Sequence, residues 1–245
     1  MAIAGEIREK IKGMREGKVF SLRDVSGEAS NDVAAMVQLS RMVKAGELTR
    51  LSKGRFYKPR KSIYGELKPS EFEVCKDFLE KDGRTVGYLT GYSAYNAMGL
   101  TTQVSSRIEI GRAKARPPVR RGKYEILFSV QPNEILAEDV PLLRILDVLK
   151  DVSRVPDATP GEVVQRLRGL VGGLELRQQE RMVRLAMKYP ARVRALTGAM
   201  LALEGTCDED VSRLRESLNG VTRYKLPIGA GVLKNAKEWR IYETA

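Results

Sequence analysis

Four side chains suited to contacting base edges recur along one stretch of the sequence. Asn31, Ala34, Gln38 and Arg41 are spaced three or four residues apart, so on a helix they would share one face. Asn and Gln can pair with adenine, Arg can pair with guanine, and Ala leaves room for a thymine methyl group. Ser30, just before them, is of the type that caps a helix N-terminus, as is Asn31. The pattern predicts a helix that presents a base-contacting face to a DNA major groove.

The surrounding elements would position that face. We predict that the helix reaches Ala45 and ends at Gly46, with an inner stripe of Met36, Leu39 and Val43. Upstream, the periodicity predicts a first helix over 3–14, a short strand over 18–21 and a capped helical turn beginning at Ser21.

A basic hairpin is predicted directly after this helix. Residues 47–51 and 55–59 alternate as strands do, and Ser52-Lys53-Gly54 would join them. The order of elements is that of a winged helix-turn-helix, whose wing would bring cations to phosphates or into a minor groove: Arg50, Lys53, Arg55 and Lys58. The alternative is a solvated basic hairpin on a winged helix that binds proteins.

The charge is concentrated in the same region. The chain of 245 residues has a formal net charge of +12, and residues 1–65 hold 14 Lys and Arg against 7 Asp and Glu. Residues 133–245 hold 18 against 16. This asymmetry predicts a polyanionic partner and salt-dependent binding, although charge alone does not separate DNA from RNA.

A second basic run lies between two predicted strands, 107–110 and 124–130. Pro117-Pro118 interrupts it, so residues 111–123 are expected to form an exposed loop or hairpin tip. Two interpretations stay open: contact with an acidic protein surface or with phosphates, or a solvated loop. The candidate contact residues are Arg112, Lys114, Arg116, Arg120, Arg121 and Lys123.

Catalysis, metals and cofactors find no support in the sequence. The chain has no histidine, which removes the commonest general base and metal ligand. Cys75 and Cys207 are far apart and are expected to be buried thiols. The acidic run 208–210 is expected to start a helix rather than bind Mg²⁺. We therefore assign no catalytic residue, no metal and no cofactor.

The expected fold class is α+β, with a winged helix-turn-helix over 1–65 and a larger mixed, mainly helical domain over 66–245 that contains a small sheet as well as helices. Residues 60–69 are expected to be a linker, and 70–82 a helix with Phe72, Cys75, Phe78 and Leu79 inward. Helices dominate from Glu138 onward, and Trp239 is expected to pack against them. No apolar run approaches the ~20 residues that span a bilayer, and the N-terminus lacks a signal-peptide core, so a cytoplasmic location is expected.

Several blocks resemble the AbiE-type antitoxins of bacterial abortive-infection, type IV toxin-antitoxin systems. They are residues 39–59, 89–104, 107–110 and 189–199, and together they extend over most of the chain. Phe56-Tyr57 departs from the aliphatic residue and Tyr that we expected at the wing exit.

The resemblance implies a non-enzymatic autorepressor that binds inverted repeats in its own promoter and counteracts a nucleotidyltransferase-like toxin. The DNA-contacting positions it implies are Ser30, Asn31, Gln38 and Arg41, with Arg50, Lys53 and Arg55 on the wing. Two alternatives are a stand-alone regulator with a ligand-binding or dimerising C-terminal domain, and an RNA-processing enzyme or accessory factor.

Overall fold

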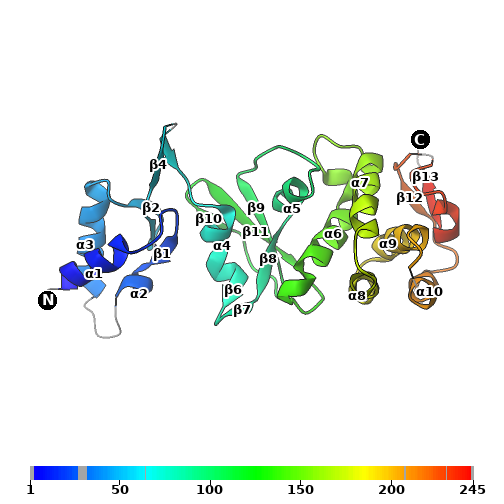
Figure 1. The fold of residues 1–245 in the computed structure, drawn as a ribbon, viewed down its shortest axis with the longest axis horizontal. Helices are drawn as coiled ribbons and strands as arrows, with labels where there is room; N and C mark the ends of the chain where they lie inside the picture. The colour runs from blue at the N-terminus through cyan, green and yellow to red at the C-terminus, as the bar shows by residue number, and fades with distance from the viewer. Residues whose placement is uncertain (1–2, 27–31, 64, 207, 230, 244–245) are drawn as a thin grey trace. The chain divides into compact units, whose positions relative to one another are not determined.

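The computed structural model describes residues 3–26, 32–63, 65–206, 208–229 and 231–243 (Figure 1). It is a mixed α+β protein with several small sheets. The chain forms two compact units. Unit 1 comprises Met1–Leu79 and Pro118–Ile126, and unit 2 comprises Glu80–Pro117 and Leu127–Ala245. Unit 1 therefore extends past residue 65, where we had expected a domain boundary.

The first elements of unit 1 follow the predicted order. They are α1 (Ile3–Lys12), β1 (Val19–Ser21), α2 (Leu22–Val25), α3 (Asp32–Lys44), β2 (Thr49–Ser52) and β3 (Arg55–Tyr57). The three strands form an antiparallel sheet in the order β1-β3-β2. One apolar core joins the helices to this sheet: Ile7, Ile11, Phe20, Val25, Ala35, Leu39, Met42, Leu48 and Phe56.

The residues buried on the inner side of α3 are not the ones that we predicted, apart from Leu39. Ala35, Leu39 and Met42 are buried, whereas Met36 and Val43 are only half-buried at the edges of the contact. A helix with apolar residues on several sides offers more than one stripe, and packing against α1 and the sheet selects among them.

A hairpin occupies the segment expected to be a linker. It comprises β4 (Arg60–Ser62) and β5 (Gly65–Leu67), and it extends from unit 1 as a two-stranded ribbon (Figure 1). Glu66 anchors its base, because its Oε1 accepts hydrogen bonds from Tyr57 Oη at 2.6 Å and Thr49 Oγ1 at 2.9 Å. Burial, together with this bond, raises the pKa of Tyr57 to about 12. The linker prediction was wrong because composition does not reveal such a side-chain anchor.

Unit 1 is completed by α4 (Glu71–Leu79), β10 (Val119–Arg121) and the beginning of β11 (Tyr124–Val130), which pairs antiparallel with β10. Cys75, Phe78 and Leu79 are buried on α4 as predicted, but Phe72 is 41% exposed and Val74 is buried. Burial raises the pKa of the Cys75 thiol to about 12. Cys207 lies outside the described residues.

Unit 2 combines short strands with a helical bundle. Its strands and helices are β6 (Glu80–Lys81), β7 (Arg84–Thr85), β8 (Gly87–Thr90), α5 (Tyr92–Ala97), β9 (Arg107–Arg112), α6 (Val140–Lys150), α7 (Pro160–Gly172), α8 (Leu176–Ala186), α9 (Ala191–Leu203), α10 (Asp208–Glu216), β12 (Tyr224–Leu226) and β13 (Ile241–Glu243). Three single turns of 3₁₀ helix are η1 (Ala137–Asp139), η2 (Val152–Arg154) and η3 (Ala236–Trp239). No helix in the described segments is both long and apolar enough to cross a membrane.

The bundle is organised around buried apolar faces, with a polar cluster at one side. Thr159 caps α7 through a reciprocal bond with Glu162, and Trp239 is fully buried against α9, as expected. Asp147 on α6 is 7% exposed and accepts hydrogen bonds from three hydroxyl groups, those of Tyr88, Thr90 and Tyr189. We did not predict this cluster, since its members are widely separated in sequence.

Candidate nucleic-acid interface

The solvent-facing side of α3 is a shallow groove with apolar and cationic side chains. Its volume is about 540 Å³, and it is lined by Asp32, Val33, Met36, Val37, Ser40, Arg41 and Lys44. Val33 is 72% exposed and Val37 is 46% exposed, so this side of the helix presents apolar surface to solvent beside its cations. Arg41 and Lys44 are exposed, and neither has an ion pair or hydrogen bond within the described segments.

This face is rotated from the one predicted. Ala34 and Arg41 are exposed, but Gln38 is half-buried at the flank of the helix. Sequence analysis missed Val33, Val37 and Lys44 because the inner stripe was assigned to Met36 and Val43, and this choice shifted the opposite face. Placing Ala35 and Met42 inside would have identified them. Ser30 and Asn31 lie outside the described residues.

The β2–β3 hairpin presents a cation at its tip. Lys53 is exposed beside Gly54, whose φ of +72° is the conformation that a tight turn requires. Arg50 is exposed, and its Nε donates to Ser52 O at 3.3 Å. Lys58 is set back from the tip, where its Nζ donates to Lys12 O. Of the cations predicted for the wing, Lys53 is therefore the one placed at the tip.

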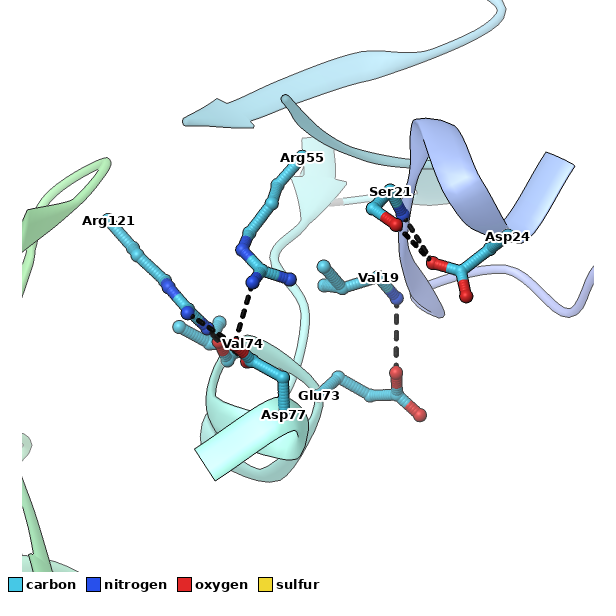
Figure 2. Close-up of polar contacts among 8 residues, drawn as sticks. All are labelled: Val19, Ser21, Asp24, Arg55, Glu73, Val74, Asp77 and Arg121. Atoms are coloured by element: carbon cyan, nitrogen blue, oxygen red, sulfur yellow. Dashed lines mark hydrogen bonds and ion pairs between the residues drawn. The ribbon is translucent and has the colours of Figure 1, made fainter. Parts of the chain in front are cut away.

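Arg55 is held inside unit 1. Its Nη2 donates to Asp77 Oδ2 at 2.6 Å, and its side chain is 26% exposed (Figure 2). Burial and the neighbouring Arg121 lower the pKa of Arg55, whereas Asp77 opposes this shift. The expectation that Arg55 projects along the wing for DNA contact is therefore corrected, because its guanidinium connects β3 to α4.

Arg121 is also a structural residue. It is 4% exposed, its Nη1 donates to Asp77 Oδ1 at 2.6 Å and to Val74 O, and its Nη2 donates to Asp77 Oδ2 at 2.8 Å (Figure 2). Its guanidinium also lies 4.1 Å from the centre of the Phe78 ring. We had placed Arg121 in an exposed loop, and this was wrong, since a side chain on one face of a short strand can be buried among charged neighbours.

A second carboxylate of α4 contacts the N-terminal elements. Glu73 is 8% exposed, and its Oε2 accepts a hydrogen bond from Val19 N at 3.0 Å (Figure 2). Its Oε1 pairs with Arg15 at 3.2 Å. Nearby, the backbone N and the hydroxyl of Ser21 both donate to Asp24, which closes the N-terminus of α2. The α4 carboxylates thus fix β1 and β3 within unit 1.

The basic run 111–123 is divided between the two units. Arg120 and Lys123 are exposed in unit 1. Arg112, Lys114 and Arg116 belong to unit 2, where the guanidinium groups of Arg112 and Arg116 lie 5.7 and 5.6 Å from the centre of the Phe128 ring. The run is therefore not one site within a single unit.

Comparison with known proteins places this arrangement in a family. A family described as "Family of unknown function (DUF6088)" matches residues 6–169, which is more than half of the chain. The chain belongs to the DUF6088 family. The DUF6088 match includes α3, the β2–β3 hairpin, α4 and the basic run, and it ends within α7.

The DUF6088 chain is also similar in fold to a crystal structure of the RV2827C protein from Mycobacterium tuberculosis. The TM-score is 0.56 at 14% sequence identity, over 99% of this chain and 92% of the other. At this identity the likeness shows the fold alone. No curated protein matches. Within the described residues there is no group of three or more His, Cys, Asp or Glu placed to hold a metal ion.

Proposed function

We propose that this protein is a double-stranded DNA-binding regulator whose elements α1 to β3 act as a winged helix-turn-helix. In this proposal α3 enters the major groove and Lys53 contacts the adjacent backbone. The observation that carries it is the exposed face of α3, where Arg41 and Lys44 accompany exposed Val33 and Val37. Arg55 and Arg121 in unit 1 pair with Asp77 instead, so their guanidinium groups are not offered to DNA in the way that Arg41 and Lys44 are.

Each side chain on this face has a counterpart in a major groove. The Arg41 guanidinium suits guanine, and Lys44 suits a phosphate. Val33, Val37 and Ala34 would pack against thymine methyl groups. Gln38, at the flank, would contact an adenine at the edge of the footprint. Such a face would combine direct base contacts with a salt-dependent backbone term.

The wider role that we propose is that of an autoregulating antitoxin without enzymatic activity. It would bind inverted repeats in its own promoter and counteract a nucleotidyltransferase-like toxin. This part rests on the resemblance of residues 39–59 and 89–104 to AbiE-type antitoxins. The proposal predicts a nucleotidyltransferase gene beside this one, and growth after co-expression of the two proteins tests it. Absence of such a gene, or failure to rescue growth, would leave the DNA-binding proposal standing alone.

The DNA-binding proposal is tested with two variants that separate base contact from backbone contact. Fluorescence anisotropy would follow binding to a duplex from upstream of the gene and to a scrambled duplex, at several salt concentrations. We expect Arg41→Ala to cost about 1–3 kcal/mol on the upstream duplex and little on the scrambled one. Lys53→Ala should weaken both and reduce the salt slope by about 1.

Lys10→Ala is the matched control, because Lys10 is an exposed cation on α1 outside the α3 face. A wild-type protein that binds both duplexes equally, with equal losses in both variants, contradicts base recognition. That outcome would leave a contact with the DNA backbone alone. Failure of the wild type to bind either duplex would favour a protein-binding role, for which exposed Val33 and Val37 are the supporting observation.

A further inference from the structure

We propose that the β10–β11 turn is a second phosphate-contacting element beside the β2–β3 hairpin, with Lys123 as its contact residue. The inference rests on the proposed DNA binding and extends its footprint to a segment some 70 residues further along the chain. Two neighbouring hairpin tips would then engage the same DNA backbone.

The first observation is the close approach of the two hairpins. Gly122, at the turn, has a φ of +57°, and a Cβ atom there would lie 3.0 Å from Leu51 O on β2. Strands β2 and β10 are in contact along this edge. A side chain at position 122 would push the turn away from β2, so glycine permits both the turn and the approach.

The second observation is the ionic link that holds the hairpins together. Asp77 accepts hydrogen bonds from Arg55 on β3 and from Arg121 on β10 (Figure 2). The pairing with Arg121 is bidentate, which fixes orientation as well as distance. Both hairpins are thereby attached to one carboxylate of α4, which fixes the positions of their two tips relative to each other.

The third observation is the distribution of charge at the tips. Lys123 is exposed, and its Nζ lies 5.1 Å from the centre of the Tyr124 ring, a cation–π arrangement that keeps the ammonium near the turn. Lys53 is exposed at the tip of the other hairpin. Arg120 is a weaker candidate, since it stands opposite Glu125 in the strand register and that carboxylate offsets its charge.

A polyanion fits these tips better than a protein surface does. Exposed Lys side chains on two separate turns form a discontinuous pair of point charges, which suits successive phosphates along a backbone. An acidic protein patch would ordinarily use apolar contacts as well. The tip residues Lys53, Gly54, Gly122 and Lys123 provide none.

The experiment measures the salt dependence of binding to the scrambled duplex, where only backbone contacts contribute. We expect Lys123→Ala to reduce the slope of log K against log salt by about 0.9, as the loss of one phosphate contact predicts. The double variant with Lys53→Ala should lose about twice as much, and Lys123→Ala should leave the ratio of upstream to scrambled affinity unchanged. Lys114→Ala is the matched control, since it removes the same charge from the part of the basic run in unit 2.

The outcomes separate this inference from the proposed function. If wild-type protein binds and Arg41→Ala and Lys53→Ala behave as expected, while Lys123→Ala keeps the wild-type slope, only the second element is overturned. Equal reductions for Lys123→Ala and Lys114→Ala also overturn it, because general attraction by the basic run would explain both. If the wild type binds neither duplex, both proposals are overturned. If, in that case, the wild type binds an acidic protein and Lys123→Ala does not, Lys123 contacts a protein instead.

Discussion

The buried Asp147 carboxylate makes the stability of unit 2 depend on pH. Its oxygens accept bonds from Tyr88 Oη at 2.7 Å, Thr90 Oγ1 at 2.9 Å and Tyr189 Oη at 2.8 Å. Burial raises the pKa of Asp147 above its ordinary 3.8, and the three hydroxyl donors only partly oppose that shift. Gln131 joins the same cluster by donating to both tyrosine hydroxyl groups. Relative to the unfolded chain, folding therefore shifts the titration of Asp147 to higher pH.

This predicts a pH dependence of stability with a definite sign. A carboxyl group whose pKa is raised by folding contributes most below its unfolded value, and that contribution is lost as the pH rises through the folded value. The free energy of unfolding of wild-type protein, relative to Asp147→Asn, should therefore fall as the pH rises from 3.8 and then level off. The total fall in the free energy of unfolding is about 1.4 kcal/mol for each unit by which folding raises the pKa of Asp147.

Urea denaturation of both proteins at pH values from about 3.5 to about 8 checks this expectation, because the titration of Asp147 should fall within that range. Glu216→Gln controls for the loss of a carboxylate at an exposed position. A difference between wild type and Asp147→Asn that rises with pH would contradict the assigned direction.

At the scale of elements, the packing of η3 on α9 depends on one glycine. A Cβ atom at Gly198 would lie 2.1 Å from an atom of the Trp239 ring, and Trp239 is fully buried. Gly198→Ala should destabilise the protein by about 1–3 kcal/mol through overpacking, despite the better helix propensity of alanine.

The matched control is Gly169→Ala on α7. No atom lies within 4 Å of a Cβ built there, so removing a mid-helix glycine should stabilise by roughly 0.5–1 kcal/mol. Thermal or urea unfolding of the two variants should thus move in opposite directions. Equal shifts would mean that helix propensity, rather than the contact with Trp239, decides the outcome at Gly198.

Sequence analysis predicted elements better than it predicted what they contact. Periodicity and turn residues sufficed for α3, for the β2–β3 hairpin and for β11, since those signals are local. They did not suffice for the β4–β5 hairpin, which is anchored by Glu66 through Tyr57 and Thr49. The same limit applies to the candidate interface, because the burial of Arg121 and the pairing of Arg55 depend on Asp77, which no local pattern connects to either.

At the scale of the whole molecule, the two units contain separate apolar cores. The unit 1 cluster contains residues between Ile7 and Phe56, whereas the unit 2 cluster contains residues between Tyr88 and Ile241. Trp239 is the single tryptophan of the chain and belongs to the second cluster. Its fluorescence therefore reports on unit 2, while circular dichroism reports on the helices of both units.

Asp77→Asn should consequently destabilise one unit selectively. The substitution leaves the buried Arg121 guanidinium without its carboxylate and releases Arg55, at a cost of about 1–3 kcal/mol to unit 1. We expect the circular dichroism transition to begin at lower urea, while the Trp239 fluorescence transition stays at the wild-type urea concentration. Gly198→Ala should instead shift the fluorescence transition to lower urea.

Glu47→Gln is the control within unit 1, because it breaks only the exposed pair with Arg8 and should cost less than about 1 kcal/mol. If Asp77→Asn shifts both signals equally, the two cores unfold as one cooperative system, and loss of the Asp77 contacts in unit 1 also destabilises the core of unit 2.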